Sequence, residues 1–329
     1  MITQIVPVNR ESVQTAKEIL LSSGVVGMPT ETVYGLAAIG TDSQAVKKIF
    51  EIKGRPSDNP LIAHVHKDYD INKLVYVENE YALQLIKAFT PGPLTLVFKS
   101  KGVVCEEAVC GGETLAVRIP SHQGCQQLLK AVDAPLVAPS ANLSKHTSPV
   151  TAEHVYNDLN GKISLILDGG KCSGGIESTV LDVTGSVPRI LRAGLITKEM
   201  IESVVGKCEI AMHKETDKVR SPGVKYKHYR PKCQTALFSE NQIENAIKLY
   251  EQYETEGKKP YVMCRNGIAD RFNGKNILDL GETPEQIASN LYYKLLEGEK
   301  IADIIIAISM PNEQGIFLGV MNRLRKSCG

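Results

Sequence analysis

Short apolar runs recur through the first two-thirds of the chain and alternate with amphipathic stretches. Runs of this length, bounded by turn residues, are typical of buried strands. The expected strands cover residues 25–29, 61–65, 94–98, 115–119, 136–138, 163–167 and 179–183. The expected helices cover residues 42–52, with Asp42 as N-cap, and residues 78–89, 122–131 and 197–205. This alternation predicts an α/β domain with a large, twisted, mixed sheet.

The apolar pattern breaks down between residues 206 and 232, where charged and polar residues dominate. We expect an ordered linker there, because its aromatic side chains are able to seal a pocket and are unusual in a plain spacer. Beyond it, strands at 235–238, 261–264 and 303–308 alternate with helices near 242–254, 284–296 and 313–325, which predicts a small, Rossmann-like doubly wound domain. The expected division is therefore residues 1–205, 206–232 and 233–329. No Gly-x-Gly-x-x-Gly follows the first strand of the last part, so a dinucleotide site is not expected there.

Composition narrows the possible partners. The 329 residues include 38 basic and 37 acidic side chains, and a net charge of +1 does not favour nucleic acid or an anionic membrane. The N-terminal segment lacks the features of a signal peptide and no apolar run approaches a membrane span, so a cytoplasmic location is expected. The eight cysteines include no Cys-x-x-Cys pair, and free thiols are expected.

The sequence Lys53-Gly-Arg-Pro-Ser-Asp-Asn-Pro60 places two cations one residue apart in a loop that contains two prolines. Each proline restrains the residue before it, so Arg55 and Asn59 are expected to be held in extended geometry. A planar guanidinium beside a compact ammonium suits a polyphosphate better than a single carboxylate. For an isolated pair of this kind, a solvated surface loop is the alternative.

Four further segments each end an expected strand and open a turn, which is where α/β sheets bind ligands. They cover residues 29–35, 139–142, 169–179 and 191–194. Together they offer hydroxyls, amides and exposed backbone N–H groups, which are the donors that phosphate oxygens need. Each segment alone also has a structural interpretation, as an ordinary turn, a flexible hairpin or a surface charge.

His64 and His66 would point to one face of a strand, a spacing that some metal sites use. No nearby cysteine or carboxylate completes a ligand set, so a metal site is the less favoured interpretation.

Four cations lie next to strand or turn signals, namely Lys53, Arg55, Arg118 and Arg192. A nucleoside triphosphate carries roughly four negative charges at neutral pH, so these cations match a triphosphate accompanied by Mg²⁺. The Mg²⁺ would take its ligands from phosphate and water, and no metal ligand from protein side chains is expected. The chain has no Gly-x-Ser-x-Gly elbow and no Walker loop. An enzyme of this kind would act by positioning and charge stabilisation.

Five ordered motifs make the chain resemble the threonylcarbamoyl-AMP synthases of the YrdC/TsaC family. They lie at residues 24–36, 53–64, 91–96, 138–142 and 177–179. Residues 221–231 and the domain after them resemble the linker and extra C-terminal domain of the longer, two-domain members. The resemblance implies a YrdC-like α/β twist fold with a positively lined cavity, and the synthesis of L-threonylcarbamoyl-AMP and pyrophosphate from L-threonine, bicarbonate and ATP. The product would pass to a downstream threonylcarbamoyl transferase that modifies adenosine 37 (t6A) of tRNA.

The same resemblance implies residue roles. Threonine is expected to meet Thr32, His64, Arg118, Ala138 and Ser178, with Arg118 near its carboxylate. ATP is expected to meet Lys53, Arg55, Asn59, Thr114, Ser140, Asn142, Ser148 and Arg192, of which Lys53 and Arg55 are the candidate catalytic residues. Tyr226, His228 and Tyr229 would form a lid over the cavity, and a linker packed on the surface is the alternative. Where the family usually has Arg-Pro-Gly, this chain has Arg192-Ala-Gly194, so Arg192 is expected to be less rigidly held.

Two other functions compete with this one. An RNA-binding module is disfavoured by the neutral net charge and by an aromatic content of 5%. A carbamoyltransferase for hydrogenase maturation contains a similar domain, but those larger proteins carry zinc-finger-type cysteine pairs, and this sequence has none. No strong direct binding of nucleic acid is expected.

Overall fold

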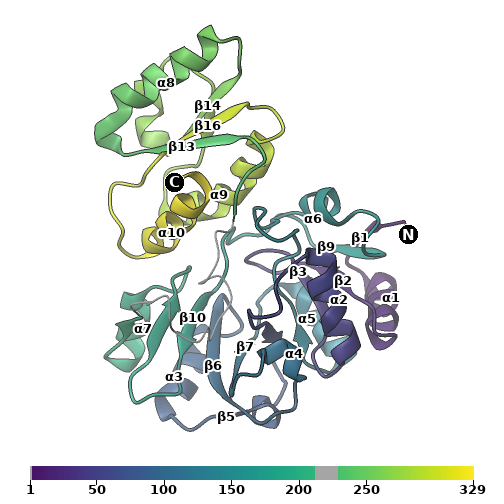
Figure 1. Cartoon of the computed structure of the whole chain (residues 1–329). Coiled ribbons are helices and arrows are strands. Elements are labelled where there is room, and N and C mark those ends of the chain that lie inside the picture. The colour runs from purple at the N-terminus through teal and green to yellow at the C-terminus, as the bar shows by residue number, and fades with distance from the viewer. Residues whose placement is uncertain (1, 212–228) are drawn as a thin grey trace.

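A computed structural model describes residues 2–211 and 229–329 (Figure 1). In these residues the N-terminal two-thirds form a mixed sheet of twelve strands with helices around it, and the C-terminal part forms a second sheet of four strands. The predicted fold class is confirmed: one large mixed sheet is followed by a small, separate parallel sheet.

The strands of the large sheet follow the order β1-β9-β2-β3-β8-β4-β7-β6-β10-β11-β12, and β5 pairs with β6. Their bounds are β1 Gln4–Pro7, β2 Val26–Met28, β3 Gly35–Ile39, β4 Ile62–His64, β5 Val75–Tyr76, β6 Leu94–Ser100, β7 Thr114–Arg118, β8 Leu136–Val137, β9 Leu165–Asp168, β10 Thr179–Asp182, β11 Arg189–Arg192 and β12 Glu209–Ile210. Parallel pairs such as β4–β7 and antiparallel pairs such as β6–β7 occur side by side. The ends of several central strands therefore meet in one region, which is where the cavity described below lies.

The helices of the large domain cover the sheet on the outside (Figure 1). Their bounds are α1 Arg10–Leu21, α2 Ser43–Lys53, α3 Glu80–Phe89, α4 Glu106–Val109, α5 Gln123–Val132, α6 Ala152–Leu159 and α7 Lys198–Val205, with a 3₁₀ turn η1 at Ile71–Lys73. Helix α2 begins as predicted, because the Asp42 carboxylate accepts the backbone N–H groups of Gln44 and Ala45. Its predicted apolar face, which includes Ile49 and Phe50, is buried.

Several features of the large domain differ from the sequence prediction, which also lacks β1, β3, β5, β11, α4 and α6. Lys53 is the last residue of α2 and does not belong to the loop, because the helix ends only at Gly54, whose φ of 58° is in the left-handed region. Helix α1 was not predicted, and it is fixed by a local capping box between Asn9 and Ser12. Strand β12 lies inside the predicted linker and pairs in parallel with β11, so the large sheet extends into that segment.

The C-terminal sheet has the order β13-β16-β14-β15, with all strands parallel. Its elements are β13 Gln234–Phe238, η2 Glu240–Gln242, α8 Ile243–Thr255, β14 Pro260–Cys264, η3 Asn266–Phe272, β15 Ile277–Asp279, α9 Pro284–Gly298, β16 Ile304–Ile308 and α10 Ile316–Cys328. Helix α8 packs in one hydrophobic cluster with one face of the sheet, whereas α9 and α10 belong to a cluster that continues into the large domain. In Figure 1, α9 and α10 lie on the side of the small sheet that faces the large domain.

None of the helices in the described residues is both long and apolar enough to span a membrane.

Candidate active site

An open cavity, whose space including its opening to solvent is about 750 Å³, lies where strand ends of the large domain meet Tyr229 near the end of the linker. The predicted site residues on its wall are Thr32, Lys53, Arg55, His64, Arg118, Ala138, Ser140, Asn142, Ser178, Arg192 and Tyr229. Further wall residues are Thr30, Val33, Tyr34, Gly35, Ile62, Pro139, Ser144, Lys145, His146 and Glu177. Segments far apart in the sequence thus converge on one hollow.

Arg118 ends β7, and its guanidinium is held by the turn that follows β2. Its Nη2 lies 2.8 Å from Oε1 of Glu31, and its Nη1 donates to Oγ1 of Thr32 at 2.8 Å. Burial raises the pKa of Glu31, but the charge and hydrogen bond of Arg118 outweigh burial and lower the pKa overall, so Glu31 is ionised at neutral pH. The Nε of Arg118 is buried and has no hydrogen-bond partner among the described residues, so it is a donor that a ligand would satisfy.

The turn itself is stabilised by a threonine hydroxyl. Oγ1 of Thr30 accepts the backbone N–H groups of Thr32 and Val33, at 3.1 and 3.2 Å. A hydroxyl that caps backbone groups in this way closes a tight turn without any help from a regular element. The Thr32 side chain is therefore presented to Arg118 in a fixed position.

His64 ends β4 and is the register partner of Arg118 on the neighbouring strand β7. Its Nδ1 lies 3.0 Å from the carbonyl oxygen of Ile62, so Nδ1 carries the proton and Nε2 is an acceptor. Burial, and then the charge of Arg118, lower the pKa of His64 to about 3. His64 is therefore neutral at pH 7 and is able to accept a hydrogen bond from a ligand.

The second histidine of the His64-x-His66 pair does not share this site. His66 lies beyond the end of β4, and its Nε2 is 2.9 Å from Oδ1 of Asp133. Across residues 2–211 and 229–329, no group of three or more histidine, cysteine, aspartate or glutamate side chains is arranged to hold a metal ion. The eight cysteines are free thiols.

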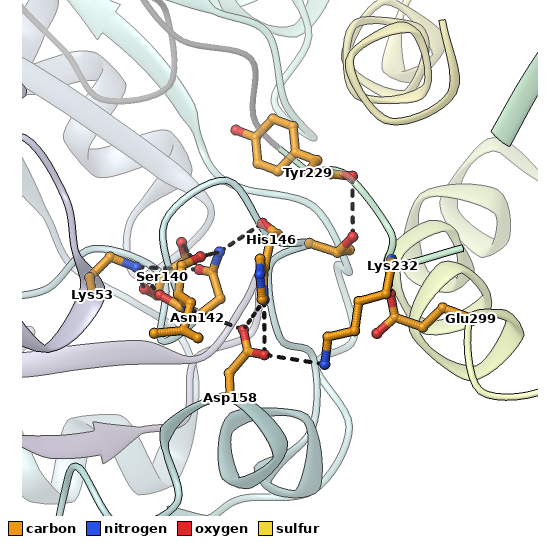
Figure 2. Close-up of polar contacts among 10 residues, drawn as sticks. Lys53, Ser140, Asn142, His146, Asp158, Tyr229, Lys232 and Glu299 are labelled. Atoms are coloured by element: carbon orange, nitrogen blue, oxygen red, sulfur yellow. Dashed lines mark hydrogen bonds and ion pairs between the residues drawn. The ribbon is translucent and has the colours of Figure 1, made fainter. Parts of the chain in front are cut away.

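Lys53 is buried at the end of α2, and its ammonium faces the loop that follows β8 (Figure 2). It donates to the carbonyl oxygens of Ser140 and Asn142 at 2.6 and 2.5 Å, and Oδ1 of Asn142 lies 3.4 Å away. Burial, and then the charge of Arg55, lower the pKa of Lys53 well below its usual range. Lys53 thus fixes the shape of the Ser140–Asn142 loop from the cavity wall.

Asp158 of α6 holds the continuation of this loop (Figure 2). Its carboxylate accepts the backbone N–H of Leu143 at 3.0 Å and lies 3.1 Å from Nδ1 of His146, which is a wall residue. The side-chain amide of Asn142 donates to the carbonyl oxygen of His146 at 2.7 Å. The loop is therefore tied down at both ends, by Lys53 and by Asp158.

The end of the linker contacts the same loop (Figure 2). Thr147 Oγ1 donates to the carbonyl oxygen of Tyr229 at 3.2 Å. The ring of Tyr229 lies 5.3 Å from that of Tyr292 on α9, measured between centroids, and forms part of the cavity wall. Of the predicted lid residues, Tyr226 and His228 lie outside the described residues.

Arg192 ends β11 and is held against the neighbouring strand β10. Its Nε donates to the carbonyl oxygen of Ser178 at 3.1 Å, and its Nη2 donates to Oγ of Ser178 at 3.2 Å. Oγ of Ser178 also lies 2.8 Å from Oγ1 of Thr95 on β6. Burial lowers the pKa of Arg192, and the charge of Arg323 lowers it further. A guanidinium still keeps its proton at neutral pH, so Arg192 brings a positive charge to the wall.

Two family models together match nearly the whole chain. One, described as telomere recombination (Sua5_yciO_yrdC), matches residues 18–194, and the other, described as threonylcarbamoyl-AMP synthase, C-terminal domain, matches residues 196–329. The threonylcarbamoyl-AMP synthase of Pyrococcus abyssi is 40% identical over 93% of this chain and 90% of its own length, and that of Bacillus subtilis is 39% identical over 100% and 96%. The crystal structure of P. abyssi Sua5 complexed with L-threonine has a TM-score of 0.91 at 38% identity, covering 99% of this chain and 97% of that one.

The chain belongs to the threonylcarbamoyl-AMP synthase family. The resemblance inferred from the five motifs is thereby confirmed, including the longer form with an additional C-terminal domain.

Three residues with a predicted ATP contact do not reach the cavity wall. Thr114 begins β7 whereas Arg118 ends it, which places the two about 13 Å apart along the strand. Ser148 lies behind the wall and donates to Oε1 of Glu177 at 2.7 Å. Asn59 is buried, and its carbonyl oxygen accepts from Nη2 of Arg55 at 3.1 Å. A role of these three residues in ATP binding stays a prediction.

Sequence reasoning missed several wall residues. Glu177 and Tyr34 lie inside motifs that were interpreted through their neighbouring residues. The carboxylate of Glu177, directly before the predicted site residue Ser178, could have indicated a wall residue. Ser144, Lys145 and His146 reach the wall only because of the loop geometry that Lys53 and Asp158 impose. No local pattern in the sequence indicates that geometry.

Proposed function

We propose that this cavity binds L-threonine and ATP together, and that the chain converts threonine, bicarbonate and ATP into threonylcarbamoyl-AMP and pyrophosphate. The observation that carries this proposal is the shared wall. Arg118 with neutral His64 forms one end, and Lys53, Arg55 and Arg192 supply cations to the same hollow. A site for a single small anion would not need both the Arg118–His64 end and the three further cations.

Arg118 supports the binding of the threonine carboxylate. Its guanidinium is buried and fixed by Glu31 and Thr32, so little side-chain freedom is lost when a ligand binds. The open Nε offers a charge-assisted hydrogen bond, and the neighbouring neutral His64 accepts from an ammonium or hydroxyl group. The similar Sua5 of P. abyssi forms a crystalline complex with L-threonine, which supports the same occupant here.

The threonine hydroxyl requires polar partners on the wall. The hydroxyls of Thr32 and Ser178 lie on the cavity and are held by neighbouring groups. A site built to hydrogen-bond a substrate hydroxyl rejects an analogue that lacks it far better than an apolar pocket rejects an added one. We therefore propose that Thr32 and Ser178 recognise the threonine side chain by hydrogen bonding to its hydroxyl.

The cations at the other end support the binding of the triphosphate. Lys53 and Arg192 are buried, and Arg55 is partly buried with an Nε that has no hydrogen-bond partner among the described residues. Burial strengthens the interaction of a fixed charge with a phosphate, because less water competes for it. Ser140 presents its hydroxyl beside the carbonyl oxygen that Lys53 holds.

The chemistry then needs orientation and charge stabilisation. The amine of threonine loses a proton and attacks the carbon of bicarbonate, which gives the carbamate and water. A carbamate oxygen next attacks the α-phosphorus of ATP, and the bond to the β-phosphate oxygen breaks to release pyrophosphate. The cations stabilise the charge that moves onto the leaving group, and the wall holds the nucleophile in line.

Mg²⁺ is proposed to arrive with ATP. The two glutamates of the wall region are committed to guanidinium partners, Glu31 to Arg118 and Glu177 to Arg323. A cation that enters with the nucleotide would therefore take phosphate and water oxygens as ligands, as Mg²⁺ commonly does. We also propose that the product passes to a downstream transferase that modifies tRNA.

The direct test is product detection by mass spectrometry with ¹³C-bicarbonate, L-threonine, ATP and Mg²⁺. The expected product carries one ¹³C and disappears when any one substrate is left out. L-2-Aminobutyrate, which lacks the hydroxyl, tests the reading of the side chain. Product formation from carbamoyl phosphate in place of threonine and bicarbonate would instead support a carbamoyltransferase. Salt-dependent binding of tRNA without any ATP turnover would support an RNA-binding module.

A further inference from the structure

Glu177 lies on the cavity wall, yet most of its contacts come from outside the threonine and ATP subsites. Its side chain is 9% exposed. Its carboxylate accepts hydrogen bonds from Oγ of Ser148 at 2.7 Å and from the hydroxyl of Tyr292 at 3.1 and 3.3 Å. Its ion-pair partner is Arg323, whose Nε lies 3.1 Å from Oε2. Tyr292 and Arg323 both belong to the C-terminal domain.

Arg323 also reaches the turn that carries Arg192. Its side chain is completely buried on α10, and its Nη1 donates to the carbonyl oxygen of Ala193. The helix packs directly on this turn, because a Cβ atom at Gly319 would lie 3.3 Å from the Cα of Gly194. One guanidinium therefore ties two neighbouring parts of the cavity wall, the carboxylate of Glu177 and the backbone of the turn.

The charges around Glu177 show why its ion pair with Arg323 matters for the cavity wall. Burial raises the pKa of Glu177, but the charges of Arg323 and then Arg192 outweigh burial and lower it to about 2. Two guanidiniums thus act on one buried carboxylate. In the described residues Glu177 pairs with Arg323, whereas Arg192 donates to the backbone and hydroxyl of Ser178.

We propose that Arg323 is a positioning residue for the nucleotide end of the cavity, which neutralises Glu177 and anchors the Ala193 turn so that Arg192 faces the phosphates. This inference rests on the proposed function. It also accounts for Ala193, which stands where the family usually has proline: the bond from Arg323 supplies a restraint on the turn that a proline ring would otherwise give. The C-terminal domain thereby forms part of the active-site support.

The first experiment compares Arg323→Met with Arg325→Met. Arg325 lies on the same helix but is exposed and pairs with Glu313, so it controls for a lost arginine on α10. In the Arg323→Met variant Glu177 has lost its guanidinium partner and attracts Arg192. The KM for ATP is therefore expected to rise about tenfold, which corresponds to a loss of roughly 1.4 kcal/mol in binding free energy. The KM for threonine is expected to rise much less than the KM for ATP, because Arg118 is held by Glu31 and Ser178 keeps its contact with Thr95, and Arg325→Met should match the wild type.

A second variant separates positioning from general loss of structure. In Glu177→Gln/Arg323→Met neither buried charge remains, so Arg192 is no longer drawn away, and the KM for ATP should fall well below that of the single variant even though the contact with Ala193 is still missing. A merely structural role of Arg323 predicts the opposite, with the double variant at least as impaired as the single one. If Arg323→Met does not fold, Arg323→Lys keeps the charge and loses one of the two contacts, and an intermediate KM for ATP is expected.

A readout independent of turnover is the crystal structure of Arg323→Met. The inference predicts that the Arg192 guanidinium moves from Ser178 to Glu177. Arg192 unchanged on Ser178, or equal increases in the KM values for ATP and threonine, would overturn it. If the wild type made no threonylcarbamoyl-AMP, the proposed function would fail, whereas the position of Arg192 in the variant would still decide the role of Arg323.

Discussion

His64 and Arg118 are register partners on the neighbouring parallel strands β4 and β7, and both side chains reach the cavity wall. The guanidinium contributes, after burial, to a His64 pKa of about 3. A permanent cation therefore stands beside a neutral acceptor. This pairing suits an amino acid, whose carboxylate needs a cation and whose ammonium or hydroxyl group needs an acceptor.

The low pKa of His64 predicts how acid affects stability. The unfolded chain takes up a proton near the ordinary value of 6.5, whereas the folded chain does so only near about 3. Between these values acid favours the unfolded state, so the contribution of His64 is fully present above pH 6.5 and is lost as the pH falls toward 3. One such group gives a slope of at most about 1.4 kcal/mol per pH unit.

The measurement is the free energy of unfolding against pH for the wild type and His64→Gln. Glutamine has no proton to gain in this range, so the variant should show a shallower slope between pH 6.5 and 3. Identical slopes in the two proteins would show that His64 titrates normally in the folded chain.

Arg118→Lys tests the threonine end. The variant loses the planar fork that contacts both Glu31 and Thr32, and a lysine ammonium is more strongly hydrated and less suited to a buried pair. The KM for threonine should rise by about tenfold or more, with a much smaller effect on the KM for ATP. Steady-state kinetics with each substrate varied in turn gives both values. Arg189→Lys, at an exposed position on β11, is the matched control and should behave as the wild type.

Lys53→Ala and Arg55→Ala test the phosphate end. Each change should cost roughly 2 kcal/mol or more of transition-state stabilisation, which is about a thirtyfold loss of kcat/KM. Lys53→Ala should also release the Ser140–Asn142 loop, because two carbonyl oxygens lose their donor. Lys47→Ala is the control on the same helix, since Lys47 is exposed and pairs with Glu107. Near-normal rates in both variants would refute the assignment of these cations to phosphate.

Asp158→Ala tests the far anchor of the same loop. The backbone N–H of Leu143 and the ring of His146 lose their acceptor, so the expected cost is about 1–3 kcal/mol of folding stability. The KM for ATP should rise as well, because Ser140 and Asn142 belong to the loop. Thermal unfolding and kinetics measure the two effects, with Asn157→Ala at an exposed position of α6 as the control. A stability loss without any change in the KM for ATP would separate this loop from the nucleotide.

The sequence was informative where local chemistry decides the structure. Asp42 caps α2 as predicted, and the strand ends that carry Thr32, Arg118 and Ser140 meet in one cavity, as their turn residues indicated. Lys53 was recognised as a site residue although its partners were not, because the carbonyl oxygens that it contacts lie 87 and 89 residues further along the chain.

Contacts between the domains were beyond the reach of sequence reasoning. Glu177 and Arg323 are 146 residues apart, and each occurs in a segment whose local pattern explains its position without the other. Pairing over such distances is determined by packing, which a single sequence does not display. Helix α1 was missed although its cap between Asn9 and Ser12 is local and readable from the sequence.

The most direct test of the shared cavity is a crystal structure with L-threonine and a non-hydrolysable ATP analogue bound together. The account predicts both ligands in the one hollow, with the threonine carboxylate on Arg118 and the phosphates along Lys53, Arg55 and Arg192. Ligands bound at separate surfaces, or a nucleotide on the C-terminal sheet, would contradict it.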